Sequence, residues 1–149
     1  MTTLYILLMV LAGAGVAAQV GVNAQLRVVA ASTLWATNIS FAVSMLAGLA
    51  VLGAAAVLGR VPTPSPALWR APGWLWLGGL GGAAYVFLAV LLAQRLGAAV
   101  LSATGILGQL GASMLIDHYG WFGLPVQRLS AERVVGLALL VVGVALVRR

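Results

Sequence analysis

The sequence contains no cysteine, no lysine and almost no acidic residue. Its 149 residues include eight Arg but only one Asp, one Glu and one His. The absence of cysteine excludes disulfides, thiol catalysis and Cys-ligated metal sites. A single His with two isolated carboxylates leaves neither an ordinary metal site nor a catalytic carboxylate pair. We therefore expect neither an enzyme nor a cofactor-binding protein.

Apolar residues are what the sequence has in abundance. They make up 63% of the chain against 7% charged residues, and the mean hydropathy is +1.13. A soluble domain carries roughly a quarter of its residues as charged side chains. The composition thus predicts a multi-pass integral membrane protein in contact with lipid. The net charge of +6 comes from Arg residues that stand mostly singly between apolar runs, which is typical of membrane loops and not of a nucleic-acid surface.

The apolar runs predict the fold class. About 20 apolar residues cross a bilayer as a helix, and the runs favour a single all-α domain of five transmembrane helices. These helices are expected at about residues 4–24, 35–58, 74–92, 98–116 and 133–147. The connection 59–73 is rich in proline and cannot be helical throughout. Ser130 is the expected N-cap of the last helix.

The arginines divide evenly between the two sides of such a five-helix chain. Four would lie on the N-terminal side (Arg60, Arg70, Arg128, Arg133) and four on the other (Arg27, Arg95, Arg148, Arg149). The bias of basic residues that normally fixes orientation is therefore absent. This balance favours insertion in both orientations and an antiparallel homodimer. The alternative is that weaker cues or a partner chain fix the orientation.

Carboxamides inside the apolar runs are the candidate solute-binding groups. Gln19 and Asn23 lie one helical turn apart in the first run, and Gln109 lies in the fourth. Three carboxamides with several hydrogen-bonding atoms each are hard to satisfy by packing alone. We expect them to line a polar cavity that binds a small molecule. The secondary candidates are Asn38, Tyr85 and Ser113, although a single Ser more often bonds its own helix.

Charged groups stand only near the ends of the predicted helices. Asp117 and its neighbour His118 are candidates for coupling or gating, because intramembrane carboxylates and His are the usual proton relays. The alternative is an ordinary interfacial acid beside an interfacial His. Since no carboxylate lies in the middle of a span, neutral polar or anionic solutes fit better than hydrophobic cations. Arg27 and Arg95 would then stand at the rim of the cavity.

Two glycines in the last helix have the spacing of a helix–helix contact. Gly136 and Gly143 are seven residues apart, on nearly one face. In lipid, small residues allow close approach of helices. The contact is either between subunits, which makes it the candidate dimer contact, or within the bundle.

Several segments resemble a known family. They are QVGVNAQLR, ISFAVSMLAG, GGLGGAAYVFLAVLLAQRLGAA, GLALLVVGVALV and, most specifically, GQLGASMLIDHYGWFGLP. Together they cover nearly the whole chain and resemble the YdcZ-like branch of the drug/metabolite transporter superfamily. The resemblance implies a five-helix protein of the bacterial inner membrane, equivalent to half of a ten-helix transporter. It also implies pairing with an identical or a paralogous subunit.

The resemblance extends to the small multidrug resistance transporters, another branch of the superfamily. The last helix is similar to their dimerisation helix. AAQVGV around Gln19 is similar to the segment that carries their essential membrane-embedded Glu. Gln cannot titrate, so proton-coupled cation exchange of that kind is not expected here.

These observations favour a secondary transporter that moves a small metabolite or xenobiotic by alternating access. Two other functions stay open: a passive dual-topology channel for a small ion or neutral solute, and a membrane subunit that only assembles with a partner. The sequence names neither the substrate, nor the direction of transport, nor the coupling ion.

Overall fold

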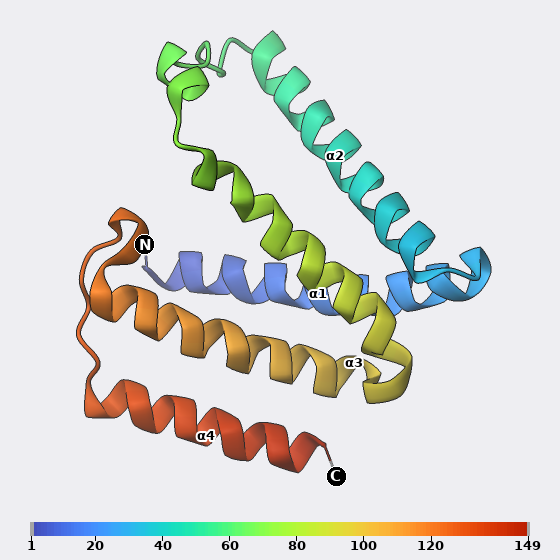
Figure 1. Cartoon of the computed structure of the whole chain (residues 1–149), viewed down its shortest axis with the longest axis vertical. Helices are drawn as coiled ribbons and strands as arrows, with labels where there is room; N and C mark the ends of the chain where they lie inside the picture. The colour runs from blue at the N-terminus through green and yellow to red at the C-terminus, as the bar shows by residue number, and fades with distance from the viewer. Residues whose placement is uncertain (1, 149) are drawn as a thin grey trace. The chain divides into compact units, whose positions relative to one another are not determined.

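The computed structural model describes residues 2–148, and all their regular structure is helical (Figure 1). The long helices are α1 (Thr2–Ala30), α2 (Thr33–Val57), α3 (Gly78–Tyr119) and α4 (Ala131–Val147). Three short 3-10 helices separate them: η1 (Pro66–Arg70), η2 (Gly73–Leu77) and η3 (Trp121–Gly123). Within residues 2–148, three segments are long and apolar enough to cross a membrane, namely Thr3–Ala30, Thr33–Val57 and Gly73–Tyr119. The prediction of an all-α membrane protein is thus confirmed.

The first two helices differ slightly from the predicted apolar runs. α1 continues to Ala30 instead of ending near Ala24, because Gln25, Leu26 and Arg27 are all good helix formers. α2 begins after Ser32, whose hydroxyl oxygen accepts a hydrogen bond from Trp35 N at 3.3 Å. The first connection is therefore very short.

α3 covers the fourth predicted helix and the third from Gly78 onward, whereas residues 74–77 belong to η2. Inside it only Gly97, at φ 75° and ψ 159°, departs from helical geometry, and it separates the helical segments 78–96 and 98–119. This backbone conformation is essentially restricted to glycine. A break therefore falls between the two predicted helices, where the sequence placed the connection.

α4 confirms the predicted N-cap. The Ser130 hydroxyl accepts a hydrogen bond from Arg133 N at 3.3 Å. The helix begins at Ala131 and its 17 residues amount to about 25 Å at 1.5 Å per residue. This length is near the lower limit for a transmembrane helix.

The chain divides into two compact units, which we name for their place in the sequence. The terminal unit comprises the residues up to Ala17 and those from Leu92 onward, and the central unit comprises Ala18–Leu91. In the terminal unit the first part of α1, the segment 98–119 and α4 run side by side, each antiparallel to its neighbour (Figure 1). The central unit contains the rest of α1, α2 and the first part of α3.

Few side chains are buried, as expected of helices that face lipid. The buried apolar residues of the central unit are Val20, Ala36, Ala89 and Val90, and those of the terminal unit are Ala93, Leu101 and Met114. Three of these seven residues are alanines, and such small residues allow close approach of helices in lipid. Large apolar side chains are mostly exposed along every long helix.

Candidate functional site

Gln19 is the first predicted site residue that makes a contact between helices. It is half-buried on α1, and its Nε2 atom donates to Ser40 Oγ of α2 at 3.4 Å. This distance is at the long end for a hydrogen bond, so the bond is weak. The Gln19 carboxamide is therefore only loosely held by the protein.

Asn23 lies one turn further along α1 and is 6% exposed. Within residues 2–148 its side chain makes no hydrogen bond. In lipid, an amide without a hydrogen-bond partner carries a free-energy cost. Thr37, the other buried polar residue, has its hydroxyl bonded to Thr33 O at 2.9 Å. Asn23 is thus a largely buried residue whose side-chain hydrogen-bonding capacity the described chain leaves unused. Its amide atoms are not fully enclosed, in contrast to Ser102 Oγ.

Arg27 joins α1 to α3 within the central unit. Its Nη1 atom donates to the backbone oxygens of Leu91 at 2.9 Å and Val90 at 3.4 Å. Both carbonyls belong to the helical segment 78–96. The guanidinium therefore contacts the helix backbone, whereas the predicted role at a cavity rim remains a prediction. Arg95, the other predicted rim residue, is exposed and contacts no polar group of residues 2–148.

The secondary candidates of the central unit do not join Gln19 and Asn23. Asn38 is exposed, and its Nδ2 atom donates to Leu34 O of its own helix at 2.9 Å. It lines a hollow of about 320 Å³ between α2 and α3, together with Phe41 and Phe87. Tyr85 is half-buried on α3. No hydrogen bond within residues 2–148 links either side chain to the α1 carboxamides.

Gly120 ends α3 and turns the chain back along it. It adopts φ 64°, and a Cβ atom there would lie 2.7 Å from Val126 Cγ2, so only glycine fits. The turn lets Gln127 N donate to Asp117 O at 2.8 Å. The loop between α3 and α4 is thereby held against the last turn of α3.

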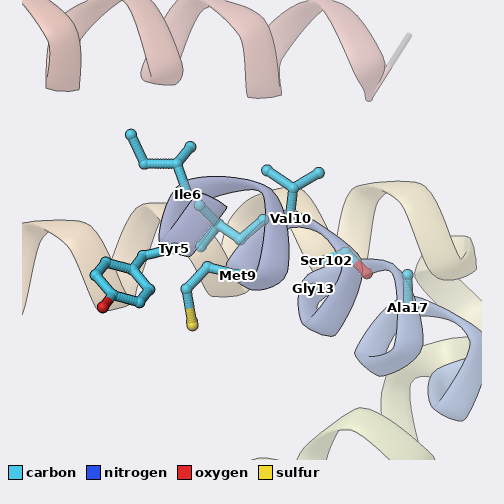
Figure 2. A pocket seen from close by; sticks show the side chains of 8 residues that line it. Tyr5, Ile6, Met9, Val10, Gly13, Ala17 and Ser102 are labelled. Atoms are coloured by element: carbon cyan, nitrogen blue, oxygen red, sulfur yellow. The ribbon is translucent and has the colours of Figure 1, made fainter. Parts of the chain in front are cut away.

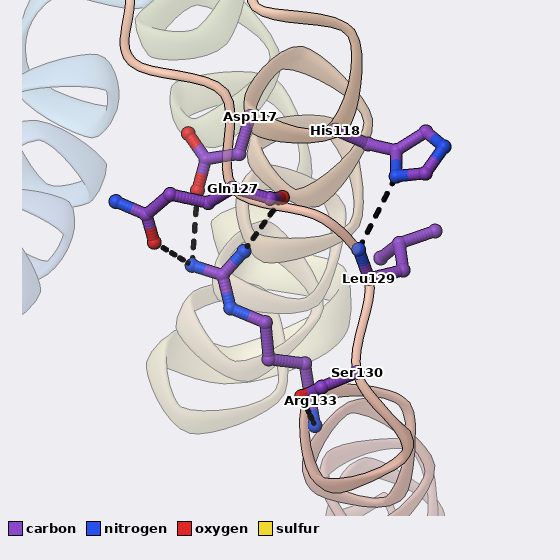
Figure 3. Close-up of polar contacts among 6 residues, drawn as sticks. All are labelled: Asp117, His118, Gln127, Leu129, Ser130 and Arg133. Carbon is purple, nitrogen blue, oxygen red and sulfur yellow. Dashed lines mark hydrogen bonds and ion pairs between the residues drawn. The ribbon is translucent and has the colours of Figure 1, made fainter.

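Asp117, Gln127 and Arg133 form a polar cluster where α3, this loop and α4 meet (Figure 3). Arg133 Nη2 lies 3.1 Å from Asp117 Oδ2 and 2.8 Å from Gln127 Oε1, and Nη1 lies 3.4 Å from Gln127 O. The ion-paired side chains are 33% (Arg133) and 27% (Asp117) exposed. A pair so exposed stabilises the fold by at most about 1 kcal/mol.

His118 stands beside this cluster and contacts the loop. Its Nδ1 atom accepts a hydrogen bond from Leu129 N at 3.2 Å, as Figure 3 shows. Its ring meets Tyr119 edge-on, and Tyr119 stacks on Trp121 at 5.4 Å between ring centroids. His118 and Asp117 therefore both fasten the loop, and their predicted role in coupling or gating remains a prediction.

The terminal unit has two hollows along the segment 98–119. The larger, about 700 Å³, is an apolar groove between α1 and α3, lined by Met9, Gly13 and Ser102 among others (Figure 2). The smaller, about 240 Å³, lies between α3 and α4 and contains Ser113, Asp117 and Arg133.

Apart from Ser40, which accepts from Gln19, several hydroxyls of the helices form two contrasting groups. The hydroxyls of Thr37, Ser44 and Thr104 each donate to a carbonyl of their own helix, which is the common arrangement for Ser and Thr inside helices. In contrast, Ser102 Oγ is buried without a partner, and Ser113 Oγ has none within residues 2–148. Both residues line the hollows just described.

The remaining predicted residues lie on open surfaces of the terminal unit. Gln109 is exposed, and its side chain has no hydrogen-bond partner in residues 2–148. Gly136 borders the smaller hollow. A Cβ atom added at Gly136 or Gly143 meets nothing within 4 Å. Internal packing in the described chain therefore does not require either glycine.

Sequence reasoning missed Gln127 and the pairing of Gln19 with Ser40. Gln127 belongs to an irregular loop, where periodicity carries no signal, and its role depends on the turn at Gly120. Ser40 stands out only once α1 and α2 are known to pack at that depth.

The family comparison matches nearly the whole chain. Residues 4–146 match the family described as "Putative inner membrane exporter, YdcZ". No curated protein and no solved structure matches the chain. The match agrees with the apolar helices and places the chain in the inner membrane as a multi-pass protein. A family of exporters is a family of transporters and not of enzymes. The chain belongs to the YdcZ family of inner membrane exporters, within the drug/metabolite transporter superfamily.

Proposed function

We propose that the protein is a secondary transporter that exports a small metabolite or xenobiotic by alternating access. Its solute contacts would be the carboxamides of Gln19 and Asn23, while the predicted solute contact at Gln109, in the terminal unit, stays a separate prediction. The observation that carries this proposal is Asn23, which is 6% exposed and has no hydrogen-bond partner in residues 2–148. A polar group of this kind in a lipid-facing helix is costly, and such groups typically mark substrate pathways.

Gln19 supports the same assignment. Its bond to Ser40 is long, at 3.4 Å, so a solute can replace Ser40 as partner at little cost. Gln19 and Asn23 are four residues apart and share a face of α1. A solute with both hydrogen-bond donors and acceptors would satisfy the two amides together. Since neither group titrates, selectivity would come from hydrogen bonding and shape.

Five membrane spans are part of the proposal. α3 has 42 residues, about 63 Å of helix at 1.5 Å per residue, which is twice the hydrocarbon thickness of about 30 Å. The break at Gly97 divides it into lengths that each suit one crossing. With α1, α2 and α4 this gives five crossings and termini on opposite sides.

The antiparallel dimer is the second structural part of the proposal. It would build an inverted repeat, as larger transporters do within one chain, with the solute site between the halves. The four-to-four division of Arg residues supports insertion in both orientations. Open space at Gly136 and Gly143 supports a subunit contact there. C-terminal reporter fusions should be active on both sides of the membrane; activity on one side alone would contradict dual insertion.

The test is a ligand-stabilisation screen of the purified protein in detergent. Cations, neutral metabolites and anions are compared by the shift in thermal unfolding temperature, since a ligand that binds the folded state raises it. We expect Gln19→Ala to abolish the shift for the stabilising solute while the dimer is retained. Gln25→Ala, which removes an exposed carboxamide from the same helix, should leave the shift unchanged.

The other two functions give different results. A channel would not show saturable exchange, and an assembly subunit would show no solute-dependent stabilisation. A full thermal shift in Gln19→Ala would contradict the proposed site directly.

A further inference from the structure

The hollow between α3 and α4 combines a charged end with an apolar wall. Asp117, Arg133 and Ser113 supply the polar atoms, and Leu110, Met114 and Leu137 supply the apolar ones. Its volume of about 240 Å³ suits a small group and not a whole drug-sized molecule. All of these residues belong to the terminal unit, so the hollow does not depend on the α1 carboxamides.

The ion pair at the charged end is incompletely used. Asp117 accepts through Oδ2 only, and within residues 2–148 its Oδ1 atom has no partner (Figure 3). Arg133 uses three of the five N–H groups of a guanidinium, in its bonds to Asp117 and Gln127. The two charged residues that line this end of the hollow therefore keep an unused carboxylate oxygen and unused guanidinium N–H groups.

The residues that line the hollow lie at different depths along α3, which is expected to cross the membrane. Asp117 lies two residues before the end of α3 at Tyr119, whereas Leu110 lies about 10 Å deeper along the helix. The charged end is thus at headgroup level and the apolar wall at acyl-chain level. A ligand with a polar head and an apolar body matches both.

We propose that this hollow binds a zwitterionic headgroup in which a primary ammonium stands close to a phosphate. The ammonium would donate to Asp117 Oδ1 and to the Ser113 hydroxyl, and the phosphate would accept from the Arg133 guanidinium. A net-neutral pair of opposite charges matches a zwitterion better than a purely anionic or purely cationic ligand. The headgroup can belong to a phospholipid or to a free phosphoethanolamine, and the test separates the two sources.

The test compares four probes on the purified full-length protein in detergent. Short-chain phosphatidylethanolamine, phosphatidylcholine, phosphatidylglycerol and free phosphoethanolamine are titrated, and binding is measured by thermal shift and native mass spectrometry. We expect phosphatidylethanolamine to bind at least tenfold more tightly than phosphatidylcholine, which has no ammonium N–H, or phosphatidylglycerol, which has no cation. Free phosphoethanolamine binding equally well would assign the site to a soluble zwitterion, and much weaker binding would assign it to lipid.

Charge-removing variants have matched controls in this chain. Asp117→Asn should weaken phosphatidylethanolamine binding about tenfold, whereas Glu132→Gln, which removes the other carboxylate, should not. Arg133→Gln should weaken it to a similar extent, and Arg128→Gln should not. Both control side chains are exposed.

Leu137→Trp keeps the test decisive if the charge variants do not fold. It fills the hollow while leaving the ion pair intact, and it should abolish binding. Equal affinity for the three phospholipids would overturn the proposal. So would phosphatidylethanolamine binding that survives Asp117→Asn or Leu137→Trp in folded protein.

Discussion

At the scale of single residues, the molecule separates polar groups that serve its own structure from those that do not. Thr37, Ser44 and Thr104 bond their own helices, and Arg27 holds carbonyls of α3. Asn23 makes no such bond in residues 2–148 although it is buried. A group kept at this cost is best explained by a ligand.

This contrast gives a prediction about stability. Asn23→Leu replaces an unpartnered buried amide with an apolar side chain of similar size. It should raise the free energy of unfolding by about 1 kcal/mol, because an apolar side chain replaces a polar group that has no hydrogen-bond partner in the described chain. Thermal unfolding in detergent measures the effect.

Thr37→Val is the control, since Thr37 is equally buried but has a bonded hydroxyl. It should leave stability unchanged or lower it slightly. A loss of stability in Asn23→Leu larger than that in Thr37→Val would mean that Asn23 is bonded in the assembled protein.

At the scale of elements, the helical content followed from the sequence more readily than the limits of the helices. Apolar runs reveal α1, α2 and α4, and the hydroxyl of Ser130 marks the start of α4. The runs do not reveal that α1 continues past Ala24, because hydropathy falls over residues 25–27 while helix propensity does not. The break in α3 depends on the backbone of a single residue, Gly97.

Gly97 should therefore be intolerant of substitution. Gly97→Ala places a Cβ at φ 75° and ψ 159°, which should lower the free energy of unfolding by about 1–3 kcal/mol. Gly108→Ala is the control, because Gly108 is inside the helical segment and a Cβ there meets nothing within 4 Å. It should be neutral or stabilise by up to about 1 kcal/mol. Chemical or thermal unfolding measures both variants. Equal changes in the free energy of unfolding for Gly97→Ala and Gly108→Ala would show that the fold does not need the break at Gly97.

α4 offers a test of the dimer contact. Gly136→Leu and Gly143→Leu add side chains where the described chain has open space, so each protomer should still fold. If that face is the subunit contact, the dissociation constant of the dimer should rise at least tenfold. Sedimentation or cross-linking measures it. Ala138→Leu and Ala145→Leu enlarge the opposite face, and the dimer should persist in both. Dissociation in all four variants, or in none, would contradict the contact.

At the scale of the whole molecule, the sequence predicts the environment well and the site only in part. Composition alone predicts that the chain lies in a membrane. The pairing of the two amides on α1 follows from their helical spacing. Whether Gln109 joins that pair does not follow, because it depends on assembly and not on periodicity. The cluster of Asp117, Gln127 and Arg133 requires the fold of the loop, which no pattern encodes.

The most direct measurement of the central claim is solute counterflow in proteoliposomes. The labelled solute is the one that stabilises the purified protein in the ligand screen. We predict saturable uptake that is accelerated by unlabelled solute inside, lost in Gln19→Ala and Asn23→Leu, and retained in Gln25→Ala. Uptake that rises linearly with concentration without counterflow, or that persists in Asn23→Leu, would contradict a carrier with its site at the α1 carboxamides.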